Sequence, residues 1–269
     1  IIKLSSNENP FVSQKVVKYI TSKKHNLNLY PESKPDDLQS VIAKILGHKL
    51  NKDNILLGNG SNEILELIAR STLDSSSEVI IPKHSFLVYE IISKVQDAKV
   101  VISEPEMNKK SFNYLGTNLE SIKNNISSKT RLIFLANPAN PTGTYISLNL
   151  IDKFIKSIPK KIRVVVDEAY YEYLDSKINK TAVSLLSKYD NLYVTRSFSK
   201  IYGLASLRIG YGISSQKNIN KLRLYKQPFN TNLFAQKAAE IAIKDQAFVN
   251  KSKKNNYVVL KSLINLFND

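Results

Sequence analysis

The segment Ser197-Phe198-Ser199-Lys200 brings two hydroxyls and one amine together directly after an apolar run. Hydroxyls can hold a phosphate, and a lysine amine that is partly desolvated near other cations has a lowered pKa. The neutral amine can then attack an aldehyde and form a Schiff base. Arg208, further along the chain, could add a permanent charge for the same phosphate. One lysine in a lysine-rich chain is more often simply solvated, so the interpretation of Lys200 depends on the motifs around it.

Asp167 is a second candidate, because it follows Val164-Val165-Val166 and should be buried with them. A buried carboxylate needs a donor or a cation, and the protonated nitrogen of a pyridine ring is such a partner. Tyr170 and Asn140 could both reach a hydroxyl oxygen on the same ring. The alternatives are a helix cap or a salt bridge for Asp167, and an ordinary turn for the Asn-Pro-Thr-Gly segment that begins at Asn140.

A third motif, Gly58-Asn59-Gly60-Ser61-Asn62, stands where a strand should pass into a helix. Glycine lets the backbone turn tightly, and the free N–H groups at a helix start bind anions such as phosphate. Taken alone, the motif is also explained by a simple tight turn.

Seven short β-rich segments could position these motifs. Several are apolar throughout, which predicts strands covered on both faces; they span residues 54–57, 78–81, 99–103, 131–135, 163–166, 192–195 and 208–213. Four of the segments run into polar clusters, and ligands gather at the carboxyl ends of strands in parallel sheets. The polar clusters therefore predict one shared site.

Helical patterns alternate with the predicted strands. One apolar face covers residues 38–46 and ends at Gly47, a second follows Ser61 and Asn62, and a third covers 148–155 with Ser147 as its N-cap. From about Ala235 the chain reads as a long helical connector, whose apolar positions include Phe248, Val258, Val259, Leu263, Ile264 and Phe267. The alternation predicts an α/β fold with a mostly parallel sheet.

Composition narrows the possible functions. The chain has 269 residues and 42% hydrophobic content, enough for a large core. Cysteine is absent, and His25, His48 and His84 have no ligand-like spacing, so we expect no metal site. No apolar run is long enough to cross a bilayer and no secretory leader is visible, so we expect no membrane partner and a cytoplasmic location. Because the first residue is Ile1, we expect the native N-terminus to be missing.

The formal net charge of +16 could favour nucleic acid or small anions. The lysines are spread along the chain, however, and the aromatic residues do not form an RNA-binding pattern. We therefore expect a solvated basic surface and no nucleic-acid partner. A basic nucleic-acid-binding protein remains the alternative from another class, and it predicts salt-sensitive binding to RNA or DNA.

Together, and in their order along the chain, these motifs resemble the fold-type I pyridoxal-phosphate (PLP) aminotransferases, specifically the histidinol-phosphate aminotransferase family. The resemblance covers nearly the whole chain. The matching stretches are Leu4-Ser5-Ser6-Asn7-Glu8-Asn9-Pro10, Tyr30-Pro31, residues 58–63, 137–144, 167–170 and 196–212, and Gln227-Pro228-Phe229-Asn230.

The resemblance implies a large domain, with a mostly parallel seven-stranded sheet sandwiched by helices, and an incomplete small α/β domain. Residues 1–27 would form an N-terminal arm, residues 28–243 the large PLP-binding domain, and residues 244–269 a connector helix with the start of the small domain. The family's C-terminal domain contains an arginine that binds the substrate carboxylate. This chain stops before it, so we expect truncation at both ends.

The resemblance also implies roles for single residues. Lys200 would form the Schiff base with PLP, Asp167 would pair with the pyridine nitrogen, and Asn140 and Tyr170 would contact the ring hydroxyl oxygen. Phe86 would stack on the ring, although a core phenylalanine is the alternative. The phosphate would be held by Gly60, Ser61, Asn62, Ser197, Ser199 and Arg208, and by Tyr30 reaching from a neighbouring subunit, which implies a homodimer with shared sites. Asn7, Glu8, Asn9 and Tyr30 would border the substrate. Ala139 and Ser206 depart from the family's usual residues without removing a catalytic group.

The implied reaction is transamination between an amino donor and a keto acid, with histidinol phosphate and 2-oxoglutarate as the pair in histidine biosynthesis. Aromatic amino-acid aminotransferases and threonine-phosphate decarboxylases share most of these motifs, so they are the nearest alternatives. A further alternative is a chain that binds PLP without turning substrate over, because the expected carboxylate-binding arginine lies beyond its last residue.

Overall fold

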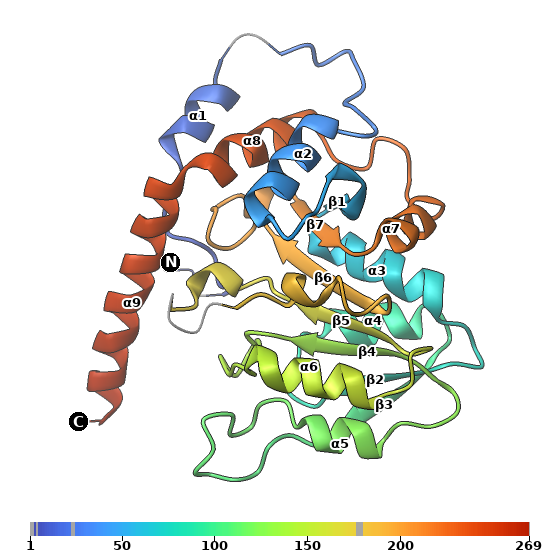
Figure 1. Ribbon diagram of the computed structural model, residues 1–269. Coiled ribbons are helices and arrows are strands. Elements are labelled where there is room, and N and C mark those ends of the chain that lie inside the picture. Colours follow the sequence, from blue (N-terminus) through green and yellow to red (C-terminus); the bar gives the residue numbers. More distant parts are fainter. Residues whose placement is uncertain (1–2, 4, 23–24, 176–179, 269) are drawn as a thin grey trace.

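A single mixed sheet of seven strands forms the centre of the molecule (Figure 1). The computed structural model describes residue 3 and residues 5–22, 25–175 and 180–268. Leu4, in the predicted N-terminal motif, lies outside the described residues. All seven predicted strands are present, and their ends differ from the prediction by two residues at most: β1 (Ile55–Asn59), β2 (Glu78–Pro82), β3 (Lys99–Ser103), β4 (Thr130–Ala136), β5 (Arg163–Asp167), β6 (Leu192–Ser197) and β7 (Ile209–Ile213).

The strand order is β1-β7-β6-β5-β4-β2-β3. Strands β2 to β6 are parallel, while β7 is antiparallel to both β6 and β1. Strand β1 therefore points the same way as β2 to β6. The carboxyl ends of β1, β4, β5 and β6 and the start of β7 consequently meet at one edge, where the polar motifs follow them.

Helices connect the strands and cover both faces of the sheet: α1 (Gln14–Ile20), α2 (Asp36–Leu46), α3 (Ser61–Thr72), α4 (Val88–Lys94), α5 (Leu119–Asn124), α6 (Leu148–Ser157), α7 (Gln216–Arg223), α8 (Leu233–Lys244) and α9 (Gln246–Asn268), with short 3₁₀ helices η1 (Lys52–Asn54), η2 (Tyr171–Tyr173), η3 (Ala182–Leu185) and η4 (Ala205–Leu207). Helix α2 ends at Gly47, whose φ of 68° suits glycine. Ser147 does precede α6, but its side chain makes no capping hydrogen bond.

The long connector helix predicted from about Ala235 is instead two helices, α8 and α9, separated at Asp245. The Asp245 carboxylate accepts hydrogen bonds from Ser13 Oγ at 2.9 Å and Lys15 Nζ at 3.0 Å. The break thus coincides with an attachment point for the chain segment that begins α1. Because both donors lie more than two hundred residues earlier, local helix propensity could not reveal the break.

Alternating residues of the strands enter two separate cores. Ile133, Leu135, Val164 and Val166 face helices α2, α6 and α8 on one side of the sheet. Leu132, Phe134, Val165 and Tyr193 face helices α3, α4 and α7 on the other side. This sandwich is the predicted one, and it explains why the central strands are apolar throughout.

Helix α9 continues from α8 and extends beyond the layers that cover the sheet (Figure 1). Phe248 near its start is buried, whereas Val258, Leu263 and Phe267 in its second half are exposed. Across the part of the chain that the structure describes, no helix combines the length and the apolar character needed to span a membrane.

Candidate active site

A cavity of about 490 Å³ lies at the edge of the sheet where the polar motifs meet. Most of the predicted site residues line it, although they come from widely separated parts of the chain. They are Asn7, Glu8, Ser61, Asn62, Phe86, Asn140, Asp167, Tyr170, Ser197, Ser199, Lys200 and Arg208. The departure noted at Ser206 also lies in this wall.

Three predicted site residues do not line this cavity. Gly60 lies just outside it, at the N-cap of α3. Asn9 instead donates from Nδ2 to the Ile201 carbonyl at 2.8 Å and to Ser252 Oγ at 2.9 Å. Tyr30 lies elsewhere on the surface with 81% of its area exposed, and its ring stacks on Phe229 at a centroid distance of 4.6 Å.

Asp167 ends β5 and is buried, as predicted. Its Oδ1 accepts hydrogen bonds from Thr195 Oγ1 at 2.9 Å and from the Ala169 N–H at 3.3 Å, and its Oδ2 accepts one from Tyr89 at 2.7 Å. Burial raises the pKa of the Asp167 carboxyl, and these three hydrogen bonds oppose that rise. The carboxylate therefore depends on its donors, and it lines the cavity where a cationic group could add to them.

Tyr89 and Thr195 were not identified as functional from the sequence. Thr195 is the last residue of a predicted strand, and its position opposite Asp167 follows from the pairing of β5 with β6. Tyr89 is the end of the aromatic stretch that contains Phe86, three residues before it. That spacing places both rings on one side of a helical turn, and it is the signal that could have suggested Tyr89.

Lys200 approaches the cavity from the loop that follows β6. Its Nζ donates to the Ser6 carbonyl at 2.7 Å and lies 5.5 Å from the centre of the Tyr170 ring. Burial lowers the pKa of Lys200, the positive charge of Arg208 lowers it further, and Glu8 opposes both. The amine is therefore easier to deprotonate than an ordinary surface lysine, as a nucleophilic role requires.

A cluster of donors faces the cavity beside the start of α3. Helix α3 has twelve residues, and its first N–H groups, including those of Ser61 and Asn62, belong to the turn that lacks intrahelical partners. Arg208 lies against this turn and donates from Nη1 to Ser199 Oγ at 3.4 Å. A side chain at Gly60 would meet the Arg208 guanidinium at 2.5 Å, so only glycine admits this approach. The arrangement is suited to a phosphate.

The loop that contains Asn140 is held by a neighbouring asparagine. Asn137 donates from Nδ2 to the Ile146 carbonyl at 3.0 Å, and its Oδ1 accepts from the Ile146 N–H at 2.8 Å. These two bonds close the loop between β4 and α6. Asn140 is thereby placed at the cavity, while Asn7 Nδ2 donates to Tyr170 Oη at 3.0 Å on the adjoining wall.

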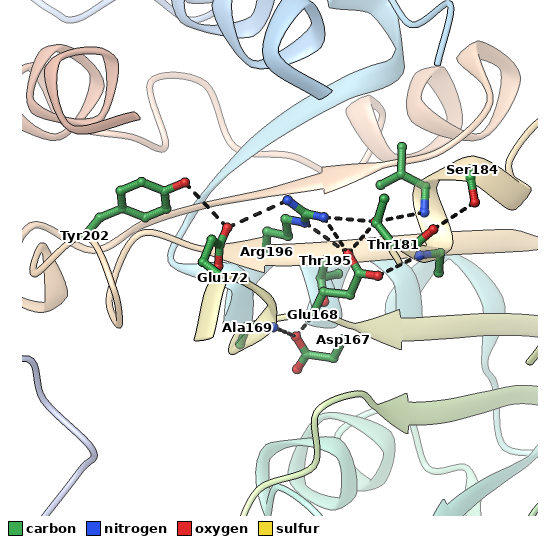
Figure 2. Close-up of polar contacts among 11 residues, drawn as sticks. Asp167, Glu168, Ala169, Glu172, Thr181, Ser184, Thr195, Arg196 and Tyr202 are labelled. Carbon is green, nitrogen blue, oxygen red and sulfur yellow. Dashed lines mark hydrogen bonds and ion pairs between the residues drawn. The ribbon is translucent and has the colours of Figure 1, made fainter. Parts of the chain in front are cut away.

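A buried ion pair is formed by the residues that directly follow Asp167 and Thr195 in the chain (Figure 2). Arg196 donates to Glu168 Oε2 from Nε at 3.0 Å and from Nη2 at 2.8 Å, and both side chains are almost fully buried. Glu168 also accepts from Thr181 Oγ1 at 2.8 Å and from the Ala182 N–H at 2.7 Å. Because Glu168 follows Asp167 and Arg196 follows Thr195, the pair joins the two segments that hold the cavity carboxylate.

The same arginine extends the network to the next turn. Its guanidinium carbon lies 3.8 Å from the centre of the Tyr171 ring, and Nη1 lies 3.7 Å from Glu172 Oε1. Tyr202 contacts the same Glu172 oxygen at 3.5 Å, as Figure 2 shows. Burial raises the pKa of Glu172, and the charge of Arg196 opposes the rise. The Arg196 guanidinium thus links β6 to the turn after β5 and, through Glu172, to the turn after Lys200.

The chain is similar in sequence to proteins of a known family. Residues 1–267 match the aminotransferase class I and II family. The histidinol-phosphate aminotransferase of Pelagibacter ubique (strain HTCC1062) is 43% identical over 257 residues, which are 95% of this chain and 69% of the relative. Histidinol-phosphate aminotransferase 2 of Pasteurella multocida (strain Pm70) is 39% identical over 268 residues, 99% of this chain and 71% of the relative.

Solved structures show the same fold. The histidinol-phosphate aminotransferase from Clostridium acetobutylicum superposes with a TM-score of 0.79 at 28% identity, covering 93% of this chain and 71% of that one. The enzyme from Sinorhizobium meliloti, solved in complex with pyridoxal-5'-phosphate, gives a TM-score of 0.82 at 23% identity, covering 92% of this chain and 65% of that one.

The Arg196 network generates a stability prediction. Arg196→Met leaves Glu168 buried without its cation, so we expect the free energy of unfolding to fall by about 3–5 kcal/mol. Lys188→Met is the matched control, because Lys188 forms an exposed pair with Asp152 at 3.3 Å and its loss should cost less than about 1 kcal/mol. Urea unfolding measures both.

A double variant tests the physical reason for this cost. Adding Glu168→Gln to Arg196→Met removes the unpaired charge, so it should recover part of the lost stability. Equal losses of unfolding free energy in Arg196→Met and Lys188→Met would show that the buried pair stabilises the fold no more than the exposed pair does.

Proposed function

The chain belongs to the class I and II aminotransferases, and from this premise we propose that it transfers the amino group between histidinol phosphate and 2-oxoglutarate in histidine biosynthesis. The observation that supports the proposal most is one cavity lined by a lysine of lowered pKa, a buried carboxylate and an anion-binding turn. The relatives named above supply the substrate, since both are histidinol-phosphate aminotransferases.

The cofactor of the protein is PLP, and the residues present fit it. The cavity offers an acceptor for a pyridine N–H at Asp167, an amine at Lys200 and donors for a phosphate around Arg208. The space that only glycine leaves at position 60 admits the guanidinium to the turn where that phosphate would sit. When bound, PLP supplies an electron sink for the bonds of the substrate α-carbon.

Several residues of the cavity wall, together with Gly60 beside it, have proposed roles toward PLP. Asp167 accepts the ring N–H, Asn140 and Tyr170 bond the ring hydroxyl oxygen, and Phe86 stacks on the ring. The phosphate is held by Gly60, Ser61, Asn62, Ser197, Ser199 and Arg208. These assignments rest on the family resemblance and, for every residue except Gly60, on its position in the cavity wall.

Lys200 is the proposed group for proton transfer. Its Nζ would hold PLP covalently, and as a free amine it would take up the proton of the substrate α-carbon. A lowered pKa suits both tasks, because only the neutral amine is a nucleophile and a base. Asp167 keeps the pyridine nitrogen protonated during the transfer.

The substrate should enter from the side of the N-terminal segment. A second cavity of about 830 Å³ adjoins the first, and both are lined by Asn7, Glu8, Asn140 and Tyr170. Asn9 lines this second cavity as well. Its position supports the proposal that Asn7, Glu8 and Asn9 border the substrate.

The proposal also covers the quaternary structure, the cellular location and the domain division of the protein. We propose a cytoplasmic homodimer in which Tyr30 of each chain reaches the phosphate site of the other. The exposure of Tyr30, at 81%, supports contact with a partner more than a role in its own cavity. The division into an arm of residues 1–27, a large domain of residues 28–243 and a segment of residues 244–269 remains part of the proposal.

Cofactor attachment is tested at Lys200. Purified protein with PLP should absorb visible light, and borohydride should leave the cofactor covalently bound to the peptide that contains Lys200. Lys200→Ala should lose the covalent adduct and reduce transamination by about 10²–10⁴-fold or more. Lys221→Arg is the control, because Lys221 also donates to a backbone carbonyl and burial lowers its pKa too. An unchanged adduct in Lys200→Ala would refute the assignment.

Substrate choice is tested by offering three amino compounds with PLP-loaded protein. Histidinol phosphate should be converted with 2-oxoglutarate to the corresponding ketone and glutamate, with kcat/KM at least about tenfold above that for phenylalanine, a difference of 1.4 kcal/mol or more in transition-state binding. Release of carbon dioxide from threonine phosphate would instead support a decarboxylase. Preference for phenylalanine would support an aromatic aminotransferase.

The shared site is tested by subunit complementation. Tyr30→Ala alone should weaken PLP binding by about tenfold, in line with the loss of one hydrogen bond to a charged phosphate. At a PLP concentration that leaves Tyr30→Ala protein largely unloaded, mixing it with Lys200→Ala protein after mild dissociation should raise activity, because each hybrid dimer contains one site with both residues. No recovery in mixtures shown by mass to contain hybrids would contradict the shared-site arrangement.

A further inference from the structure

Tyr89 is completely buried, yet it lines the cavity and its hydroxyl contacts a second buried polar group. It is the second residue of α4, and its hydroxyl donates to Asp167 Oδ2 at 2.7 Å. Burial raises the pKa of Tyr89 well above its usual range, and the charge of Asp167 raises it further. The hydroxyl thus keeps its proton and remains a donor throughout the working pH range.

The position of the Tyr89 ring is set by its neighbours. It stacks parallel to the Phe134 ring, with a centroid distance of 4.7 Å and an interplanar angle of 1°. The Phe86 ring meets it edge to face at 5.8 Å and 90°. Because Phe134 belongs to β4, an interior strand, the Tyr89 hydroxyl is held relative to the sheet and not only to its own short helix.

The hydrogen bonds that Asp167 accepts from the described residues leave one acceptor position on its carboxylate. A carboxylate has about four acceptor positions, two on each oxygen. Among the described residues, Thr195 and Ala169 take the two positions on Oδ1, as seen in part in Figure 2, and Tyr89 takes one on Oδ2. The remaining position is therefore on Oδ2, in a residue that lines the cavity.

We propose that Tyr89 is a positioning residue, whose hydroxyl aims Oδ2 of Asp167 at the pyridine N–H of bound PLP and keeps this oxygen ionised. The inference rests on the proposed role of Asp167 and adds to it the oxygen that binds and the group that orients it. Tyr89 does not touch the reacting atoms. It acts through the carboxylate, while its ring supports the Phe86 ring that is proposed to stack on PLP.

Tyr89→Phe tests the role of the hydroxyl while keeping the ring and its packing. The variant should bind PLP about 10- to 100-fold more weakly, because a hydrogen bond to a charged group is lost. Titration of the cofactor-free protein with PLP, followed by visible absorption, measures the dissociation constant without relying on turnover. Tyr193→Phe is the matched control, since it removes a buried hydroxyl from the same core without touching the three bonds of Asp167.

The pH dependence of PLP affinity distinguishes the loss of the Tyr89 hydrogen bond from a packing defect. The Tyr89 bond lowers the pKa of Asp167, so its loss lets the carboxyl keep its proton to higher pH. The deficit of Tyr89→Phe in PLP affinity should therefore be largest at the acidic end and shrink as the pH rises. Glu168 and Tyr170 interact electrostatically with this carboxyl, and Lys200 and Arg208 line the same cavity, but these groups are common to both proteins.

A double-variant cycle separates the hydroxyl from general stability. If Tyr89 acts through Asp167, Tyr89→Phe should weaken PLP binding in the wild-type background but hardly at all in an Asp167→Asn background. Equal losses in both backgrounds, or wild-type affinity with an unshifted pH profile in Tyr89→Phe, would overturn the inference. Thermal melting without PLP identifies any variant that fails to fold. In that case the cycle is repeated with Thr195→Val, because Thr195 donates to the opposite oxygen of Asp167. Its deficit in PLP affinity should likewise vanish in the Asp167→Asn background.

The outcomes also distinguish this inference from the function on which it rests. Wild-type protein that binds no PLP would refute the proposed function and this inference together. Wild-type protein that binds PLP, with Tyr89→Phe binding it equally well, would refute only the role of Tyr89.

Discussion

The ion pair between Arg196 and Glu168 joins the ends of β5 and β6, the two strands that present Asp167 and lead to Lys200. Side chains alternate across a strand, and Asp167 and Ser197, each next to one member of the ion pair, line the cavity. Two buried charges are costly to desolvate, and here two further hydrogen bonds, from Thr181 and Ala182, satisfy the carboxylate. The pair therefore constrains the relative position of the strand ends, which in turn sets the geometry of the cavity wall.

Asp167 and Glu168 are adjacent carboxylates with contrasting surroundings. Glu168 has a cation of its own, whereas the donors that reach Asp167 among the described residues are neutral: a tyrosine, a threonine and a backbone N–H. Burial without a cation raises the pKa of Asp167 and leaves a position for a cationic ligand. The fold supplies the cation partner of Glu168, whereas the proposed partner of Asp167 is the pyridine N–H of PLP, so one strand end would serve both structure and binding.

Much of this organisation could be predicted from local sequence. Short β-rich runs, several of them apolar throughout, located all seven strands, because strands covered on both faces are mostly apolar. The polar motifs at their ends indicated the cavity wall. Contacts between distant segments could not be predicted in this way: Tyr89 and Asp167 are 78 residues apart, and the break at Asp245 depends on Ser13 and Lys15. Arg196 and Glu168 were visible within motifs, but their pairing required the register of β5 and β6. The role expected for Tyr30 requires a second chain, which a single sequence cannot place.

The N-terminal segment links the cofactor site to the space beside it. Ser6 accepts from Lys200 and Asn7 donates to Tyr170, so this segment contacts two of the groups expected to engage PLP. The covalent attachment proposed for PLP would use the same Lys200 amine that now donates to the Ser6 carbonyl, so attachment would require this contact to change. Breaking one exposed hydrogen bond costs only about 1 kcal/mol, and Asn9 remains fixed to the Ile201 carbonyl and to Ser252 on α9. The residues before Asn9 can therefore release Lys200 while the N-terminal segment stays attached. The bonds of Asn9, including the one to α9, keep this segment beside the cavity, and the contact between Ser6 and Lys200 is not needed for that.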